Sequence, residues 1–129
     1  MQPSIPDAKT FATHFEPHDN TDWEYLTHHY RRFATTLEEF CSSWELSRGK
    51  RVLDIGAHWL HQAILWKQAG FEVIAVDMPI TFEMTSVQSL ARANDIELIP
   101  CHDLEAGIEL DVLPDSSVDV ILLRKSSNT

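Results

Sequence analysis

Two acidic residues lie in or after apolar runs of the sequence, where carboxylates could bind the hydroxyl groups of a nucleoside. A short apolar run, Val52-Leu53, leads into Asp54, Ile55 and Gly56, and a second run, 73–76, leads into Asp77. Asp77 follows Gly56 by 21 residues, close to the ~20 that separate the turn from the acid in dinucleotide-binding folds. An adenosine-type ligand over such strand ends would donate hydrogen bonds from its ribose hydroxyls to Asp77.

The segment that positions these acids, 51–79, has the pattern of a strand, a tight turn, a helix and a second strand. Both apolar runs are continuous, which is typical of parallel strands buried on both faces. Gly70 is placed to end the helix, and Pro79 ends the second strand because it cannot extend a strand ladder. Gly56 suits a turn that approaches a ligand closely, since it has no Cβ. The sequence therefore predicts the first βαβ unit of a nucleotide-binding sheet.

Four motifs between residues 51 and 123 follow one another in a recognisable order. They are VLDIG, AVD, CHDLE (Cys101 to Glu105) and LPDSSVDVILL (Leu113 to Leu123). This order resembles that of class I S-adenosylmethionine-dependent methyltransferases. The family usually has a G-x-G-x-G turn, whereas here only Gly56 matches and His58 and Leu60 occupy the next two glycine places. A side chain at position 58 must either turn away from the ligand or fill space that the methionine moiety needs.

The resemblance implies a site for S-adenosylmethionine at the strand ends. In the family, an acid at the place of Asp54 helps to hold the amino end of the methionine moiety, and the residue at the place of Met78 often lies against adenine. Asp103 falls where the family's acid accepts a hydrogen bond from the adenine amino group, with Leu104 beside the ring. The candidate cofactor-binding residues are Asp54, Gly56, His58, Asp77, Met78, Asp103 and Leu104.

Simpler interpretations of the same residues stay open. Asp54 also suits the cap of the following helix, Asp103 a turn, and Met78 ordinary loop packing. His58 and His61 are three residues apart and could bind a metal together with His102 or Cys101, but this spacing often arises by chance. No residue has the setting of a general base, so the catalytic residues are unknown and no metal is expected.

The N-terminal part is expected to contain an arm and a long helix. Residues 1–20, with several prolines and scattered polar residues, predict a flexible or loosely docked arm. An amphipathic helix is predicted over 21–48, with Thr21 and Glu24 as a capping box. Its apolar stripe consists of Trp23, Leu26, Tyr30, Phe33, Leu37, Phe40 and Trp44. This helix would pack on the sheet or cover the cofactor cleft, or form a coiled coil between two copies.

Composition narrows the possible partners. The 129-residue chain has a net charge of −10 and no basic stripe, which argues against nucleic acid held through its phosphates. The sequence has two cysteines, Cys41 and Cys101, which are far apart. This pattern fits reduced intracellular thiols better than a framework of disulfide bonds. No apolar run approaches the length of a membrane span, and the N-terminus lacks the pattern of a signal peptide. We therefore expect a cytoplasmic protein with a small-molecule cofactor as its partner.

The predicted fold class is α/β: a Rossmann-like three-layer arrangement with a mostly parallel sheet in the order 3-2-1-4. Strands are predicted over 97–100 and 118–123, with a short helix over 86–93. Together with the N-terminal helix they would form a partial methyltransferase domain over 21–129, whose cofactor-binding core is 51–123.

The predicted function is the cofactor-binding portion of an S-adenosylmethionine-dependent methyltransferase, truncated after the fourth strand and therefore incomplete for catalysis. One alternative is a fragment of a nicotinamide-dependent oxidoreductase, because an acid at the tip of the second strand suits NAD equally well. Another is a non-catalytic, degenerate interaction module, which His58 and Leu60 at glycine places favour. The strand 118–123 would be an almost wholly apolar edge strand, so self-association through this edge is also expected.

Overall fold

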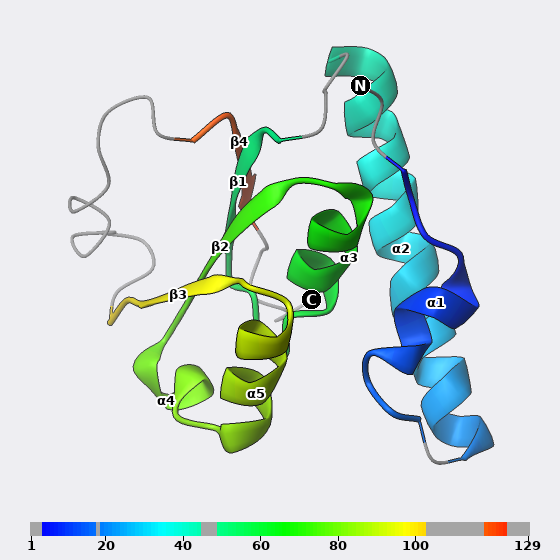
Figure 1. Cartoon of the computed structure of the whole chain (residues 1–129), viewed down its shortest axis with the longest axis horizontal. Coiled ribbons are helices and arrows are strands. Elements are labelled where there is room, and N and C mark those ends of the chain that lie inside the picture. The colour runs from blue at the N-terminus through cyan, green and yellow to red at the C-terminus, as the bar shows by residue number, and fades with distance from the viewer. Residues whose placement is uncertain (1–3, 18, 45–48, 103–117, 124–129) are drawn as a thin grey trace.

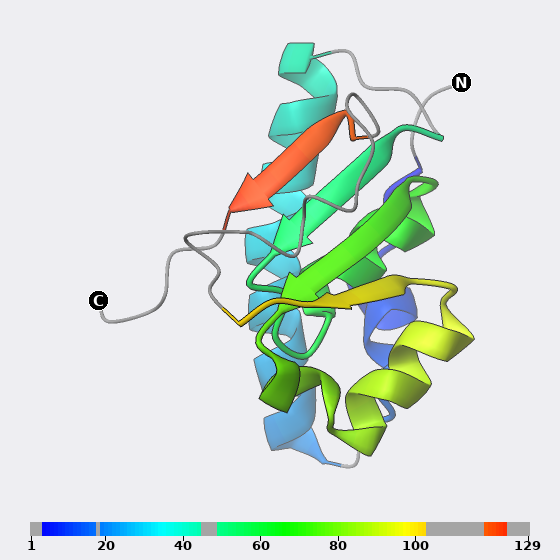
Figure 2. The ribbon, with the colours of Figure 1, turned by 90° about the vertical axis from the view of Figure 1, so that its left-hand side faces the viewer.

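A sheet of four parallel strands organises the described part of the chain. The computed structural model describes residues 4–17, 19–44, 49–102 and 118–123. The strands are β1 (Arg51–Ile55), β2 (Glu72–Asp77), β3 (Glu97–Pro100) and β4 (Val120–Leu123). Their order is β3-β2-β1-β4 and each neighbouring pair is parallel, which confirms the predicted 3-2-1-4 sheet (Figure 2).

The two faces of the sheet bury different apolar side chains. Val52 and Val73 belong to the main core on the helical side, whereas Leu53 and Val76 belong to a second buried cluster. Successive side chains of a strand point to opposite faces, so a strand with both faces buried must be apolar at consecutive positions. This is the physical reason for the continuous apolar runs in the sequence.

The longer helices lie on one face of the sheet. Helices α3 (His61–Ala69) and α5 (Thr85–Ala93) follow β1 and β2, and α2 (Asn20–Trp44) packs against the outer side of α3 (Figure 1). The predicted three-layer arrangement also needs helices on the opposite face, and no helix of the described residues covers it. None of the described helices is both long enough and apolar enough to cross a membrane.

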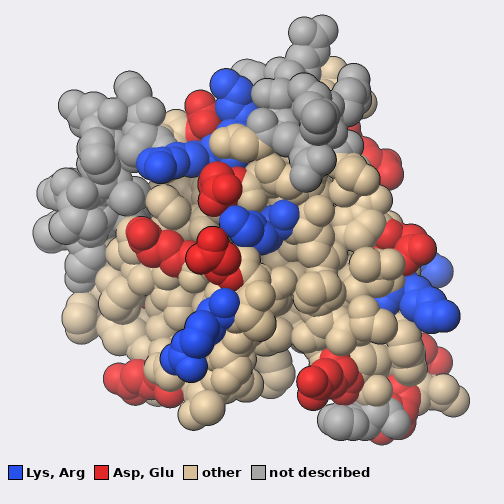
Figure 3. Space-filling model, in the orientation of Figure 1, with Lys and Arg blue, Asp and Glu red and all other residues tan. Residues whose placement is uncertain are grey.

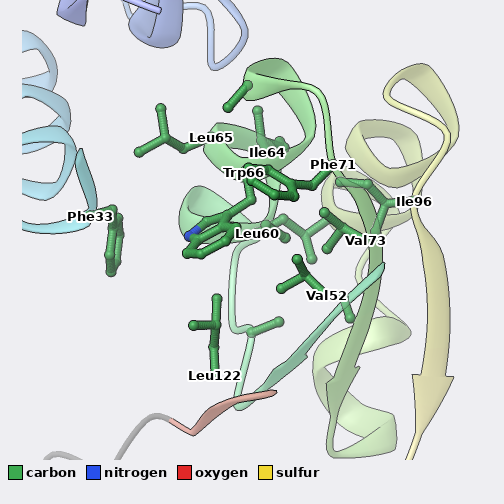
Figure 4. Close-up of a cluster of buried hydrophobic side chains, with 14 of the residues drawn as sticks. Phe33, Val52, Leu60, Ile64, Leu65, Trp66, Phe71, Val73, Ile96 and Leu122 are labelled. Atoms are coloured by element: carbon green, nitrogen blue, oxygen red, sulfur yellow. The ribbon is translucent and has the colours of Figure 1, made fainter. Parts of the chain in front are cut away.

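Helix α3 is buried nearly all round and not only on the side that faces the sheet. Its Trp66 is fully buried, 5.0 Å from the ring of Phe71 and 5.7 Å from the ring of Phe40 on α2. Figure 4 shows Trp66 with Phe33 on one side and Phe71 on the other. Replacing a buried tryptophan by alanine typically costs about 3–5 kcal/mol. Trp66 is therefore a main link between the sheet layer and α2.

Helix α2 confirms the predicted amphipathic stripe, with changes at its start. Leu26, Phe33 and Leu37 are buried, whereas Trp23 is 37% exposed. The cap lies earlier than predicted, because Asp19 Oδ1 accepts a hydrogen bond of 2.9 Å from the N–H of Asp22. The predicted capping box is therefore wrong, and the predicted end of the helix, 45–48, lies outside the described residues.

Part of the segment predicted to be a flexible arm instead forms a packed helix, α1 (Ala8–Thr13). Hydrogen bonds from Thr10 to the Asp7 carboxylate cap it and lower the pKa of Asp7. Phe11 is fully buried, and the hydroxyl of Tyr30 on α2 donates a 2.7 Å hydrogen bond to the carbonyl of Pro6. These contacts with residues far along the chain hold the segment, and its local composition does not indicate them.

The remaining differences from prediction are small. The connection after Asp77 contains a short helix, α4 (Pro79–Phe82), which Pro79 begins because its fixed φ suits a first helical turn. Strand β4 begins two residues later than predicted, and Asp119 instead bonds to the start of β1. Its N–H donates to the carbonyl of Arg51, and its carboxylate accepts from the N–H of Arg51, both at 2.8 Å. The predicted turn at 113–117 lies outside the described residues.

Candidate cofactor site at the ends of β1 and β2

The turn after β1 folds back onto the end of β2. Gly56 has a φ of 81°, a left-handed conformation that favours glycine. The N–H groups of Gly56 and Ala57 both donate to the carbonyl oxygen of Val76, at 2.8 and 3.1 Å. The sequence correctly places a tight glycine turn here, and these bonds fix the turn against the last residues of β2.

Asp77 lies at the tip of β2, directly beside this turn. The residue is 4% exposed. Its Oδ1 accepts a 2.7 Å hydrogen bond from the N–H of Met78, and its Oδ2 accepts one of 2.6 Å from the N–H of His58. Its own carbonyl accepts a 2.9 Å bond from the N–H of Cys101, which follows β3. The turn after β1, the start of the connection after β2 and the residue after β3 thus all bond to Asp77, the first two through its carboxylate.

His58 closes over this carboxylate. Its imidazole Nδ1 lies 3.8 Å from Asp77 Oδ2, while the side chain as a whole is 56% exposed. The ring thus stands beside Asp77, the acid predicted to bind the ribose. His58 and Leu60 adopt φ values of 49° and 69°, so the turn keeps glycine-like backbone angles without glycine. Such a conformation costs roughly 1–2 kcal/mol per non-glycine residue.

The other candidate residues differ in accessibility. Asp54 is only 1% exposed and pairs in register with Ala75 of β2 and Leu122 of β4, so it lies inside the sheet. Met78 is 46% exposed and precedes α4. Asp103 and Leu104, predicted to bind adenine, lie outside the described residues.

The alternative metal site is not assembled. His58 turns to Asp77, whereas His61 is buried and its ring stacks on that of His29, with 5.0 Å between ring centres and 7° between planes. Within the described ranges, no group of three or more histidine, cysteine, aspartate or glutamate residues is placed to hold a metal ion. Although His58 and His61 are three residues apart, their side chains therefore lie in two different environments.

A second feature was missed in the sequence. A cavity of about 600 Å³, whose lining does not include Asp77, lies between the start of α2, the start of α3 and α5. Its lining includes Tyr25 and Trp59, which are 53% and 58% exposed. The hollow depends on how segments distant in the sequence meet, so no local pattern indicates it.

Comparisons with known proteins address the fold. No family model matches the chain, and a search of curated proteins also finds no match. Among solved structures, the chain is similar to the C-terminal domain of precorrin-6Y C5,15-methyltransferase from Rhodobacter capsulatus, with a TM-score of 0.51 and 20% identity over 66% of this chain and 44% of that chain. It also matches YjhP from E. coli, with a TM-score of 0.40 and 16% identity over 74% of this chain and 37% of that one.

The chain thus spans less than half the length of either structure. The chain has a Rossmann-like fold similar to that of the precorrin-6Y methyltransferase domain.

Proposed function

We propose that this chain binds S-adenosylmethionine over the carboxyl ends of β1 and β2, as the cofactor-binding portion of a methyltransferase. The observation that carries this proposal is the nearly buried carboxylate of Asp77 at the tip of β2, beside the turn after β1. Ligands of open α/β sheets bind outside the carboxyl ends of the strands. We place this function in the cytoplasm, where the two widely separated cysteines would stay reduced.

The residues at the strand ends fit this cofactor after one movement. An ionised carboxylate has about four acceptor positions, and the N–H groups of His58 and Met78 use two of those on Asp77. The other positions suit two neighbouring ribose hydroxyls. The His58 ring stands in front of them, and because its side chain is 56% exposed it can rotate away without disturbing the core.

Each remaining candidate has a distinct task in this proposal. The exposed Met78 would place its polarizable thioether against adenine, with Asp103 and Leu104 completing that side. Asp54, buried inside the sheet, would support the turn and act on the amino end of the methionine moiety through water. When bound, the cofactor supplies an electrophilic methyl group on its sulfonium. The protein would contribute position and exclusion of water, and no residue is proposed as a general base.

A second candidate function follows from the position of His58. If the imidazole stays on Asp77, the carboxylate remains covered and the domain is a non-catalytic interaction module. The side chains at both glycine places favour this candidate. The nicotinamide alternative rests on Asp77 alone, since the sequence has no G-x-G-x-x-G turn.

Calorimetric titration separates the three candidates. S-adenosylhomocysteine, the product form of the cofactor, and NAD are titrated separately into the folded chain. The methyltransferase proposal expects saturable binding of S-adenosylhomocysteine and none of NAD. Binding of NAD alone would support the oxidoreductase alternative. No heat from either ligand, with an unchanged circular dichroism spectrum, would support the interaction module.

A further inference from the structure

The cavity between the helices has the size of a ligand site. It holds about 600 Å³, within the ~300–1,000 Å³ typical of small-molecule pockets. Its wall is built from the loop 14–17, the first turns of α2, the start of α3 and one side of α5. None of Asp54, Gly56, His58, Asp77 or Met78 lines it. It therefore shares no lining residue with the described part of the proposed cofactor site.

Aromatic rings form a large part of this wall. Tyr25 comes from α2 and Trp59 from the turn between β1 and α3, and each leaves more than half of its surface exposed. Phe15, also in the lining, is held by His61, with 4.7 Å between their ring centres. His61 in turn lies 5.8 Å from the ring of Tyr25 in an edge-on arrangement. These contacts with His61 fix the positions of the Tyr25 and Phe15 rings. The two rings are therefore preorganised before any ligand binds.

The charge of the lining selects one class of ligand. Glu16 and Asp22 both line the cavity, and none of its described lining residues is lysine or arginine. His14, Tyr25 and His61 are the other titratable groups among its described lining residues. Acidic side chains also gather on the surface around the first turns of α2 (Figure 3). With a net charge of −10 for the chain, the site favours a cation and repels an anion.

We propose that this cavity binds an organic cation of the alkylated-ammonium class, with its methyl groups against Tyr25 and Trp59 and its charge balanced by Glu16 and Asp22. A cation over an aromatic face is attracted by the negative face of the ring, and quaternary ammonium groups lose little hydration when they make this contact. The mainly apolar lining, in which Leu90 of α5 takes part, suits the methyl groups. The proposal does not depend on methyl transfer.

The probe that tests it is choline, compared with its neutral isostere 3,3-dimethyl-1-butanol, followed by NMR of the intact chain at pH 8, where an ordinary imidazole is uncharged. Choline should shift the Trp59 indole resonance and bind at least about fivefold more tightly than the alcohol. Equal affinities, or no saturable binding of choline, would overturn the proposal.

Paired variants locate the site. Trp59→Leu, which keeps an apolar side chain but removes the ring, should weaken choline binding about fivefold or more. Trp23→Leu changes another exposed tryptophan outside the lining and should leave the affinity unchanged. Glu16→Gln should weaken binding more at low salt than at high salt, whereas Glu24→Gln, outside the lining, should not. Unchanged affinity in Trp59→Leu, with the fold intact, would contradict the assignment.

Discussion

The main-chain N–H of His58 donates a 2.6 Å hydrogen bond to Asp77 Oδ2, and the imidazole of the same residue lies 3.8 Å from that oxygen. One residue therefore both orients the carboxylate and covers it. The main-chain bond would persist with any residue at position 58 except proline, whereas the cover belongs to the side chain. The two effects can be separated by substitution.

His58→Gly is expected to leave the affinity for S-adenosylhomocysteine equal or improved. Glycine keeps the N–H bond to Asp77, removes the ring in front of it and accepts the φ of 49° without strain. Its cost is the extra entropy of the unfolded chain. His58→Asn, a shorter side chain that tolerates the same backbone conformation, serves as the matched variant. A large loss of affinity in both variants would show that the His58 side chain contacts the ligand.

The bond between Tyr30 and Pro6 gives a pH-dependent test of how the N-terminal segment is held. Tyr30→Phe should lower the free energy of unfolding by about 0.5–1.5 kcal/mol, because it removes the hydroxyl that donates to Pro6. Burial, with added repulsion from Asp7 and Glu38, raises the pKa of Tyr30 above its ordinary value of 10.0.

The sign of this pH dependence follows from the raised pKa. Only the protonated hydroxyl donates, so its contribution is complete below the unfolded pKa and is lost as the pH rises through the folded pKa. In urea titrations, the difference between wild type and Tyr30→Phe should therefore shrink above about pH 10. Tyr25→Phe, at an exposed tyrosine, is the control. A difference that stays constant across this range would refute the role of the hydroxyl.

Strand β4 lies at one edge of the described sheet, with Ile121 61% exposed. An apolar strand edge of this kind pairs readily with another strand, so we propose self-association of two copies through β4. Sedimentation across a concentration series should show dimers of the wild type and a shift to monomer in Ile121→Lys. Arg51→Lys, at the exposed start of the neighbouring β1, should behave as wild type. A wild type that remains monomeric at the highest concentration would contradict the proposal.

The sheet could be predicted because its information is local. Two continuous apolar runs, a glycine turn and an acid at a strand end specify β1 and β2, and the observed bounds of β3 are those predicted. Strand β4 is shorter than predicted because Asp119 bonds to Arg51, a residue 68 positions earlier. Helix α1 was missed for a similar reason, since beyond its local cap at Asp7 it is stabilised by the burial of Phe11 against Tyr30 of α2.

The sequence predicted which residues lie at the candidate site but not how the His58 side chain is oriented there. The pattern placed Asp77 at the tip of β2 and a non-glycine residue at position 58. The orientation of the His58 ring relative to Asp77 depends on the backbone path after β1. That path is fixed by the hydrogen bonds from Gly56 and Ala57 to the carbonyl of Val76. The cavity beside Trp59 could not be predicted because its walls come from segments distant in the sequence.

The central claim is that Asp77 binds the ribose of S-adenosylmethionine, and titration calorimetry with S-adenosylhomocysteine on Asp77→Ala tests it most directly. Hydrogen bonds to a charged group contribute about 1.5–3 kcal/mol, so the affinity should fall about tenfold or more. Asp77→Asn, which retains an acceptor for one main-chain N–H, separates loss of the ligand contact from loss of stability, and it too should bind more weakly. Wild-type affinity in both variants, with an unchanged circular dichroism spectrum, would contradict the account.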